Sequence, residues 1–146
     1  MATLTPTLTL ASTDIFVDQP LNLTVTDSLT VQAPMTDISK MATNDDIGNG
    51  AGIIIPESTD VHYVYIKHTG ILASDGTTAC NSTTDYVLLG DADGTAGMKI
   101  RLYPGEFSFF ALDAGDGSEG SGGDSGLKIT AASANVQVNY AFYKRS

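Results

Sequence analysis

The chain has 146 residues, of which 42% are hydrophobic and only 16% are charged, and its formal net charge is −10. This length favours a single domain with its own core, and the low charged fraction excludes the strongly charged class of disordered chains. The acidic balance disfavours nucleic acids and anionic membranes as partners, and the single cysteine, Cys80, excludes an internal disulfide framework.

The N-terminal segment alternates with a two-residue period. Leu4, Leu8 and Leu10 fall on one parity, and threonines occupy the other. Pro6 lacks an amide donor, which favours an extended arm or an edge strand over a central strand. We therefore expect residues 1–14 to be an N-terminal arm or edge strand. The chain start lacks the basic and apolar segments of a signal peptide, so synthesis in a cytoplasm is expected.

The alternation continues in two further short stretches, residues 21–25 and residues 29–31. Residues 26–28 between them are either a tight turn or a bulge. The pattern then dissolves over residues 33–52, where proline, asparagine and glycine interrupt it.

Residues 61–68 are expected to form a strand that is apolar on both faces. One face carries Val61, Tyr63 and Tyr65, and the other carries Val64 and Ile66. Two apolar faces indicate a strand at the centre of a sandwich, or a strand whose outer face is covered by another subunit.

Residues 87–89 predict a further short strand, followed by one in which Met98, Ile100 and Leu102 point inward. At Pro104-Gly105 the pattern predicts a type II turn, because proline presets φ and glycine accepts a positive φ. A hairpin at this turn would return Leu102 and Phe107 to the same core.

The final strand shows the clearest sorting of the chain. Its inward parity holds Val136, Val138, Tyr140 and Phe142, against polar residues on the other parity. About eight short strands with turn signals between them predict an all-β fold, a single antiparallel β-sandwich over residues 15–146. A jelly roll is the leading topology.

Candidate metal sites are weak. The run Asp91-Ala92-Asp93-Gly94 begins like a calcium loop, but Leu102 stands where a bidentate glutamate is needed, so a turn is favoured. The acidic, glycine-rich run 113–126 is interpreted as a solvated loop rather than a cation site. His62 and His68 lie six residues apart on one strand, roughly 20 Å when extended and too far for one metal. Both are expected at a surface or an interface.

No motif for catalysis or cofactor binding is found. The chain holds no nucleophile elbow, no phosphate-binding glycine loop and no helical zinc motif. Cys80 is interpreted as a free thiol in or near a loop. We therefore expect no catalytic residue, no cofactor, no metal and no enzymatic activity.

Several stretches together resemble small structural proteins of tailed bacteriophage virions, notably those of marine and cyanobacterial phages. Residues 1–10 resemble a Thr/Leu-rich arm, and residues 61–70 resemble a Tyr-Val-x-Ile/Val-Lys-Asn-Thr-Gly strand, with His68 in place of the asparagine. Residues 100–110 are similar to a Leu-x-Pro-Gly-Glu-Phe-x-Phe-Phe hairpin, and residues 138–143 to a closing strand.

The resemblance implies a head decoration (cement) protein, or else a part of the tail. Decoration proteins of this kind are expected as homotrimers on the capsid exterior, where they bind the major capsid protein and clamp neighbouring subunits. Under this hypothesis the arm of this chain docks on a capsid protein or on a sister subunit. The residues that make the contact are Leu4, Leu8, Leu10, Ile15 and Phe16. The alternative is that the arm is simply the first strand of its own sheet.

Two other functions compete with this one. One is a tail or fibre component with a receptor-binding site at one end of the domain, formed by Tyr86, Tyr103 and the polar loop 74–85. A secreted carbohydrate-binding domain is opposed by the missing signal peptide and by the absence of tryptophan.

Overall fold

The computed structural model describes residues 2–13, 20–32, 39–42, 53–55, 61–91, 100–113 and 126–146. The protein is all-β: in these residues every regular element is a strand, and every pairing of strands is antiparallel. The strands are β1 (Ala2–Leu4), β2 (Thr7–Ser12), β3 (Leu21–Thr26), β4 (Leu29–Val31), β5 (Ser39–Ala42), β6 (Ile53–Ile55), β7 (Val61–Leu72), β8 (Val87–Asp91), β9 (Ile100–Leu102), β10 (Phe107–Asp113), β11 (Leu127–Ala131) and β12 (Val136–Lys144).

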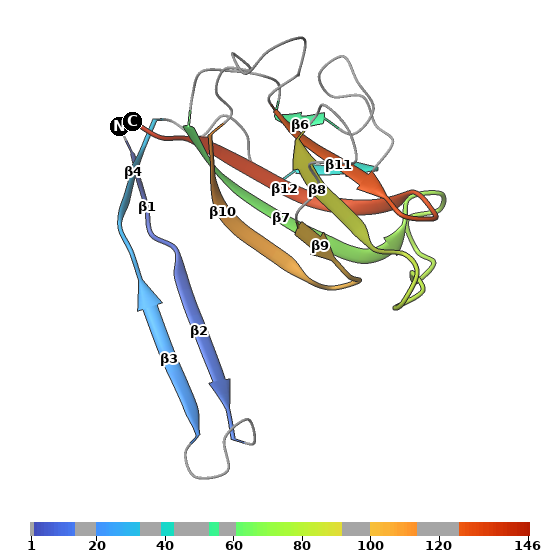
Figure 1. Cartoon of the computed structure of the whole chain (residues 1–146), viewed down its shortest axis with the longest axis horizontal. Helices are drawn as coiled ribbons and strands as arrows, with labels where there is room; N and C mark the ends of the chain where they lie inside the picture. The colour runs from blue at the N-terminus through green and yellow to red at the C-terminus, as the bar shows by residue number, and fades with distance from the viewer. Residues whose placement is uncertain are drawn as a thin grey trace.

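Strands β5 to β12 form the body, which consists of two four-stranded sheets packed face to face (Figure 1). One sheet has the order β10-β7-β12-β5, and the other has the order β6-β11-β8-β9. Following the chain, each connection crosses from one sheet to the other, except for the step from β8 to β9. Both layers therefore build up together along the chain, one sheet being completed by β11 and the other by β12.

The core lies between the inner faces of the two sheets, where the two-residue period predicted it. Val64 and Ile66 of β7 are fully buried and pack with Leu89 of β8 and Ile129 of β11. The inward parity of the final strand is likewise confirmed, since Val138 is fully buried beside them. β7 pairs with β10 on one side and β12 on the other, so it is the central strand that its two apolar faces indicated.

The turn at Pro104-Gly105 forms, but the hairpin predicted around it is wrong. Gly105 has φ +90°, and the amide of Glu106 donates to the Tyr103 carbonyl at 2.9 Å. The strand before the turn pairs with β8, and the strand after it pairs with β7 of the other sheet. The turn therefore carries the chain between layers.

Backbone hydrogen bonds to His68 explain this change of sheet. The Gly105 amide donates to the His68 carbonyl at 3.0 Å, and the His68 amide donates to the Glu106 carbonyl at 2.9 Å. These two bonds pair the chain after the turn with β7. In this register Phe107 lies opposite Lys67, on the outer face of the sheet. Leu102 is therefore 4% exposed, whereas Phe107 is 58% exposed and does not return to the core.

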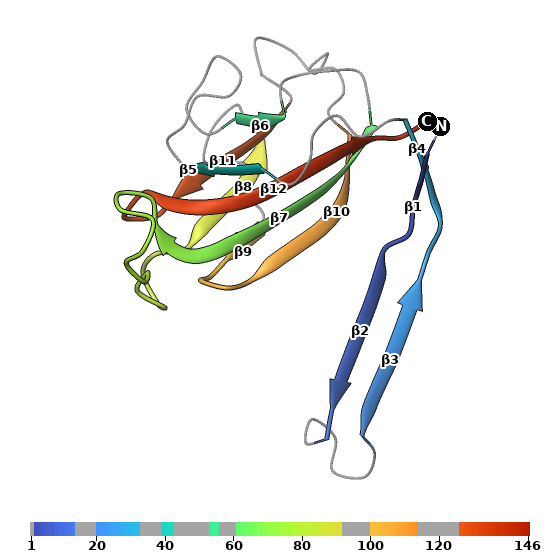
Figure 2. The same ribbon diagram turned by 180° about the vertical axis from the view of Figure 1, so that it is seen from behind.

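Strands β1 to β4 form a long two-stranded hairpin that projects from one end of the body (Figures 1 and 2). We call this hairpin the arm. Leu4 lies opposite Leu29, and Thr7 lies opposite Thr26, so the register is the same on both sides of the interruption. Residues 26–28 are therefore neither a tight turn nor a bulge.

The interruption of the ladder coincides with Pro6. Proline has no amide hydrogen to donate, and its carbonyl accepts the Asp27 amide at 3.1 Å. The arm thus continues past a single missing donor. It includes β3 and β4, which lie in the part of the sequence that we assigned to the sandwich domain.

Candidate interaction surfaces

The outer half of the arm has one apolar face and one threonine face. In an antiparallel ladder, residues directly opposite each other point to the same side. Leu8 lies opposite Val25, and Leu10 lies opposite Leu23. These four side chains, which we call the arm face, are 43% to 51% exposed. Such a cluster on a two-stranded ribbon is apolar surface that the arm itself does not bury.

The opposite side of the arm is held together by threonine pairs. The hydroxyl oxygens of Thr7 and Thr26 are 3.1 Å apart, and those of Thr9 and Thr24 are 3.5 Å apart. Threonine suits a pleated strand, and cross-strand threonine pairs add hydrogen bonds to the ladder. This side of the ribbon is therefore internally satisfied and suited to water, in contrast to the arm face.

The root of the arm is fixed to the body through the last residues of the chain. The Gln32 amide donates to the Lys144 carbonyl at 2.9 Å, and the Ser146 amide donates to the Thr30 carbonyl at 3.3 Å. Val31, which is 2% exposed, forms a β-bridge with Arg145 between these bonds. The arm therefore pairs through β4 with the residues at the end of β12 and has a defined origin on the body.

A second exposed apolar surface lies on the outside of the sheet that contains β7 and β10. Phe109 stacks on Tyr63 with ring centroids 6.3 Å apart, and Phe107 tilts against Tyr65 at 6.4 Å. We call these four rings the aromatic face. Its two phenylalanines are among the large apolar side chains exposed on the body, whereas both tyrosines are half-buried.

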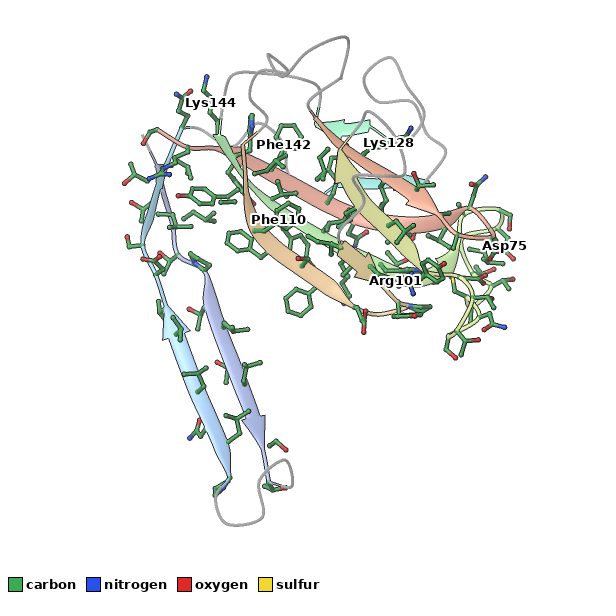
Figure 3. The ribbon with its side chains drawn as sticks, in the orientation of Figure 1. Asp75, Arg101, Phe110, Lys128, Phe142 and Lys144 are labelled. Carbon is green, nitrogen blue, oxygen red and sulfur yellow. The ribbon has the colours of Figure 1, made fainter. Side chains whose placement is uncertain are left out.

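The end of the body away from the arm carries a cluster of two tyrosines and an arginine. The rings of Tyr86 and Tyr103 meet edge to face at 5.6 Å, and the Arg101 guanidinium lies 4.3 Å from the Tyr86 ring centroid. Figure 3 shows Arg101 on the same side of the body as Asp75. A hydrogen bond from Arg101 to the Tyr103 hydroxyl raises the pKa of the guanidinium. The position of the Arg101 guanidinium over the Tyr86 ring is typical of a cation–π contact.

The loop beside this cluster is ordered by its own carboxylates. Asp75 accepts hydrogen bonds from the Thr78 hydroxyl and from the amides of Thr77 and Thr78. These donors, led by the Thr78 hydroxyl, lower the pKa of Asp75 to about 2. The Asp75 carboxylate thus closes this turn of the loop through local hydrogen bonds.

A polar network connects the buried side chains of His68 and Asp85 to the exposed Ser133. The His68 side chain is fully buried, accepts the Gly70 amide through Nδ1 at 3.0 Å and contacts the Asp85 carbonyl through Nε2 at 2.7 Å. The Asp85 carboxylate accepts from Ser133 and from the Asn81 amide, and these bonds lower its pKa. Cys80 is half-buried at the edge of this network, and desolvation raises the pKa of its thiol.

This network does not have the connectivity of a nucleophilic triad. In such a triad the histidine bridges the serine and the carboxylate. Here Ser133 bonds to the carboxylate, and His68 bonds to a backbone carbonyl. The prediction that both histidines lie at a surface or an interface is wrong: His62 is 2% exposed and packs edge to face on Phe142. Their parity, shared with Val64 and Ile66, is the signal that places them inside.

The structure brings together some of the predicted docking residues and leaves others outside its description. Leu8 and Leu10 are both on the arm face, whereas Leu4 is half-buried near the root. Ile15 and Phe16 lie outside the described residues. Leu23, Val25 and the aromatic face were missed as sites, although the alternation of residues 21–25 and the outer parity of Tyr63 and Tyr65 were visible in the sequence.

Most of the two acidic runs, 91–94 and 113–126, also lies outside the described residues, which leave out 92–94 and 114–125. Within the described ranges, no group of three or more histidine, cysteine, aspartate or glutamate side chains is positioned to hold a metal ion. The same part of the chain contains no helix that is long and apolar enough to cross a membrane. Comparison with protein-family models, with curated proteins and with solved structures finds no match.

Proposed function

We propose that this chain is a non-enzymatic virion structural protein, a decoration protein that binds the outside of a bacteriophage head and stabilises it. The observation that carries the proposal is the arm: a projecting hairpin with an exposed apolar face and a fixed root. A ribbon of this kind gains stability when a neighbouring protein covers it. The arm face docks on a neighbour in the shell, either a capsid protein or a sister subunit.

The body supports the same proposal. The strand orders of its two sheets, β10-β7-β12-β5 and β6-β11-β8-β9, support the winding of an eight-stranded jelly roll. We infer that the finer topology is of this type, which viral capsid domains and lectins share. Since a fold does not fix a function, the arm and the sequence resemblance to virion proteins remain the main support.

The proposed mechanism is thermodynamic linkage. A protein that binds only the assembled lattice stabilises that lattice by mass action. Each copy needs to bury roughly 800 Å² against its partners for a firm contact, and the many identical sites of a shell add to the effect. A net charge of −10 keeps such a crowded surface soluble.

The test is the copy number of this protein in purified particles relative to the major capsid protein, measured by quantitative mass spectrometry. We expect a ratio near that of a shell component, and we expect tailless heads to retain it. Absence from particles would overturn the proposal.

A tail or fibre component is the second candidate, favoured by the contact between Tyr86, Tyr103 and Arg101 at the end opposite the arm. Aromatic rings with a nearby cation are a common way to bind a receptor group. A ratio of a few per cent that disappears with the tails would select this function. Binding of host surface glycans should then depend on Tyr103.

A further inference from the structure

We propose that the arm face of one copy packs on the aromatic face of a second copy of this chain. The inference rests on the proposed docking of the arm and names its acceptor as a sister subunit. Both surfaces belong to the same chain, and both are left exposed by it. The arm points away from its own sheets in both views, so its acceptor lies on another molecule (Figures 1 and 2).

The local charges at the two surfaces allow a second copy as the partner. Two molecules with a net charge of −10 repel each other, so they associate through surfaces that carry little charge of their own. Within the described part of the arm, Asp27 is the one ionisable side chain. The aromatic face carries Lys67 directly opposite Phe107. Asp27 and Lys67 are therefore opposite in charge, and the Glu106 carboxylate next to Phe107 accepts the Tyr103 amide at 2.8 Å.

The two surfaces also agree in dimensions. The outer arm consists of two six-residue strands, β2 and β3, about 20 Å long at the usual rise per residue. The aromatic face spans two paired strands, and β10 with its seven residues is about 23 Å long. Each surface also presents two side chains, two residues apart, from each of two paired strands, so aliphatic side chains can lie on rings at the same spacing.

The size of one contact predicts a closed assembly. A ribbon of this width offers less than the roughly 800 Å² per partner of a stable interface. If each copy gives its arm to a neighbour and receives an arm in return, the number of contacts per copy doubles. Closed rings or two-fold exchanges are the symmetric ways to achieve this. Such an assembly leaves no unpaired arm or uncovered aromatic face.

The proposal is tested by light scattering on the purified full chain and on three variants. Leu8→Ser with Leu10→Ser changes the arm face, Phe107→Ser with Phe109→Ser changes the aromatic face, and Thr7→Ala with Thr9→Ala is the control on the other side of β2. We expect an oligomer whose dissociation constant rises at least roughly tenfold in the first two variants and stays unchanged in the third. Far-UV circular dichroism shows whether each variant is folded.

A disulfide test then identifies the acceptor surface. In a Cys80→Ser background, Leu10→Cys protein is mixed with Phe109→Cys protein under mild oxidation. We expect a mixed disulfide between them, and none when Thr9→Cys replaces Leu10→Cys.

Three results would overturn the inference. They are a monomeric wild-type chain, an oligomer unaffected by the phenylalanine variant, or cross-linking of Leu10→Cys only to itself, which would indicate arm-to-arm packing. A monomer that is still found in particles would overturn this inference alone. An oligomer that is absent from particles would instead overturn the proposed function.

Discussion

The arm and the body are built from strands with the same alternating pattern, and they differ in whether a second layer covers the apolar side. In the body, alternate residues of β7 and β12 point into a core closed by the second sheet. In the arm, alternate residues of β2 and β3 point into solvent. Alternation therefore specifies which face is apolar, whereas topology decides whether the same molecule covers it.

The comparison has an energetic consequence. Burial of apolar surface stabilises the body, but a lone two-stranded hairpin has only its ladder and its cross-strand pairs. The arm depends on its root at Val31 for the position from which it projects. We therefore expect the two regions to respond very differently to the same perturbation.

The largest expected difference is in hydrogen exchange. Amides in the centre of β7 and β12 should exchange roughly a thousandfold or more slowly than those of β2 and β3, because the arm opens without unfolding the body. Exchange measured by mass spectrometry on isolated monomers, for instance at low protein concentration, checks this. Equal protection in both regions would contradict the distinction between arm and body.

A leucine-to-alanine substitution should lower the stability of the protein in the body much more than in the arm. Leu89→Ala removes a side chain that is 1% exposed and should lower the free energy of unfolding by about 3 kcal/mol, through lost burial and a cavity. Leu23→Ala removes one that is 43% exposed and should change it by less than about 0.5 kcal/mol. Urea unfolding of the monomer measures both values. A large effect of the arm variant would show that the arm belongs to the cooperative core.

A smaller loss of stability is expected at the Pro104-Gly105 turn, which carries the chain from one sheet to the other. Gly105→Ala should cost about 1–2 kcal/mol, because φ at this position is +90° and a side chain is strained there. The added methyl group meets open space, so strain alone acts. Gly76→Ala in the loop 74–85, at φ +67°, is the matched control. It should lower the free energy of unfolding by no more than Gly105→Ala does. Unchanged stability of the Gly105 variant would contradict the turn geometry.

The smallest effect is the pH dependence of the distal loop. The pKa of Asp75 is lowered from 3.8 to about 2 in the folded protein, so its stabilising contribution is complete above 3.8 and is lost as the pH falls toward 2. Asp75→Asn should therefore lower the Tm slightly at neutral pH, and the difference from wild type should vanish near pH 2. Thermal unfolding at several pH values measures this. A difference that persists in acid would assign the effect to something other than the charge.

Much of the body could be predicted from the sequence because its alternation is regular and its core is apolar. Val64, Ile66 and Val138 were placed on the correct face by period alone. The pairing of strands was harder, since Pro104-Gly105 has the same local geometry whether the chain stays in one sheet or crosses to the other. The error at Phe107 has this origin: the backbone bonds to His68 that redirect the chain are remote in sequence.

The interaction surfaces were predicted only in part. Leu8 and Leu10 were recognised because Pro6 makes the first strand unsuitable for the centre of a sheet. Their partners Leu23 and Val25 lie in a stretch without proline and looked like ordinary core positions. Only the register between β2 and β3 shows that all four share one uncovered face. The aromatic face depends in the same way on the pairing of β7 with β10.

The connection between the arm and the last residues of the chain has a mechanical consequence. The backbone bonds of Lys144 and Ser146 join the arm in series with β12, which is flanked by β7 and β5. A tensile force applied at the tip of the arm therefore reaches an interior strand of the body through these bonds, in addition to the covalent path from β4 to the edge strand β5. Rupture under tension is expected to begin at the short junction around Val31 and Arg145, while both sheets stay folded.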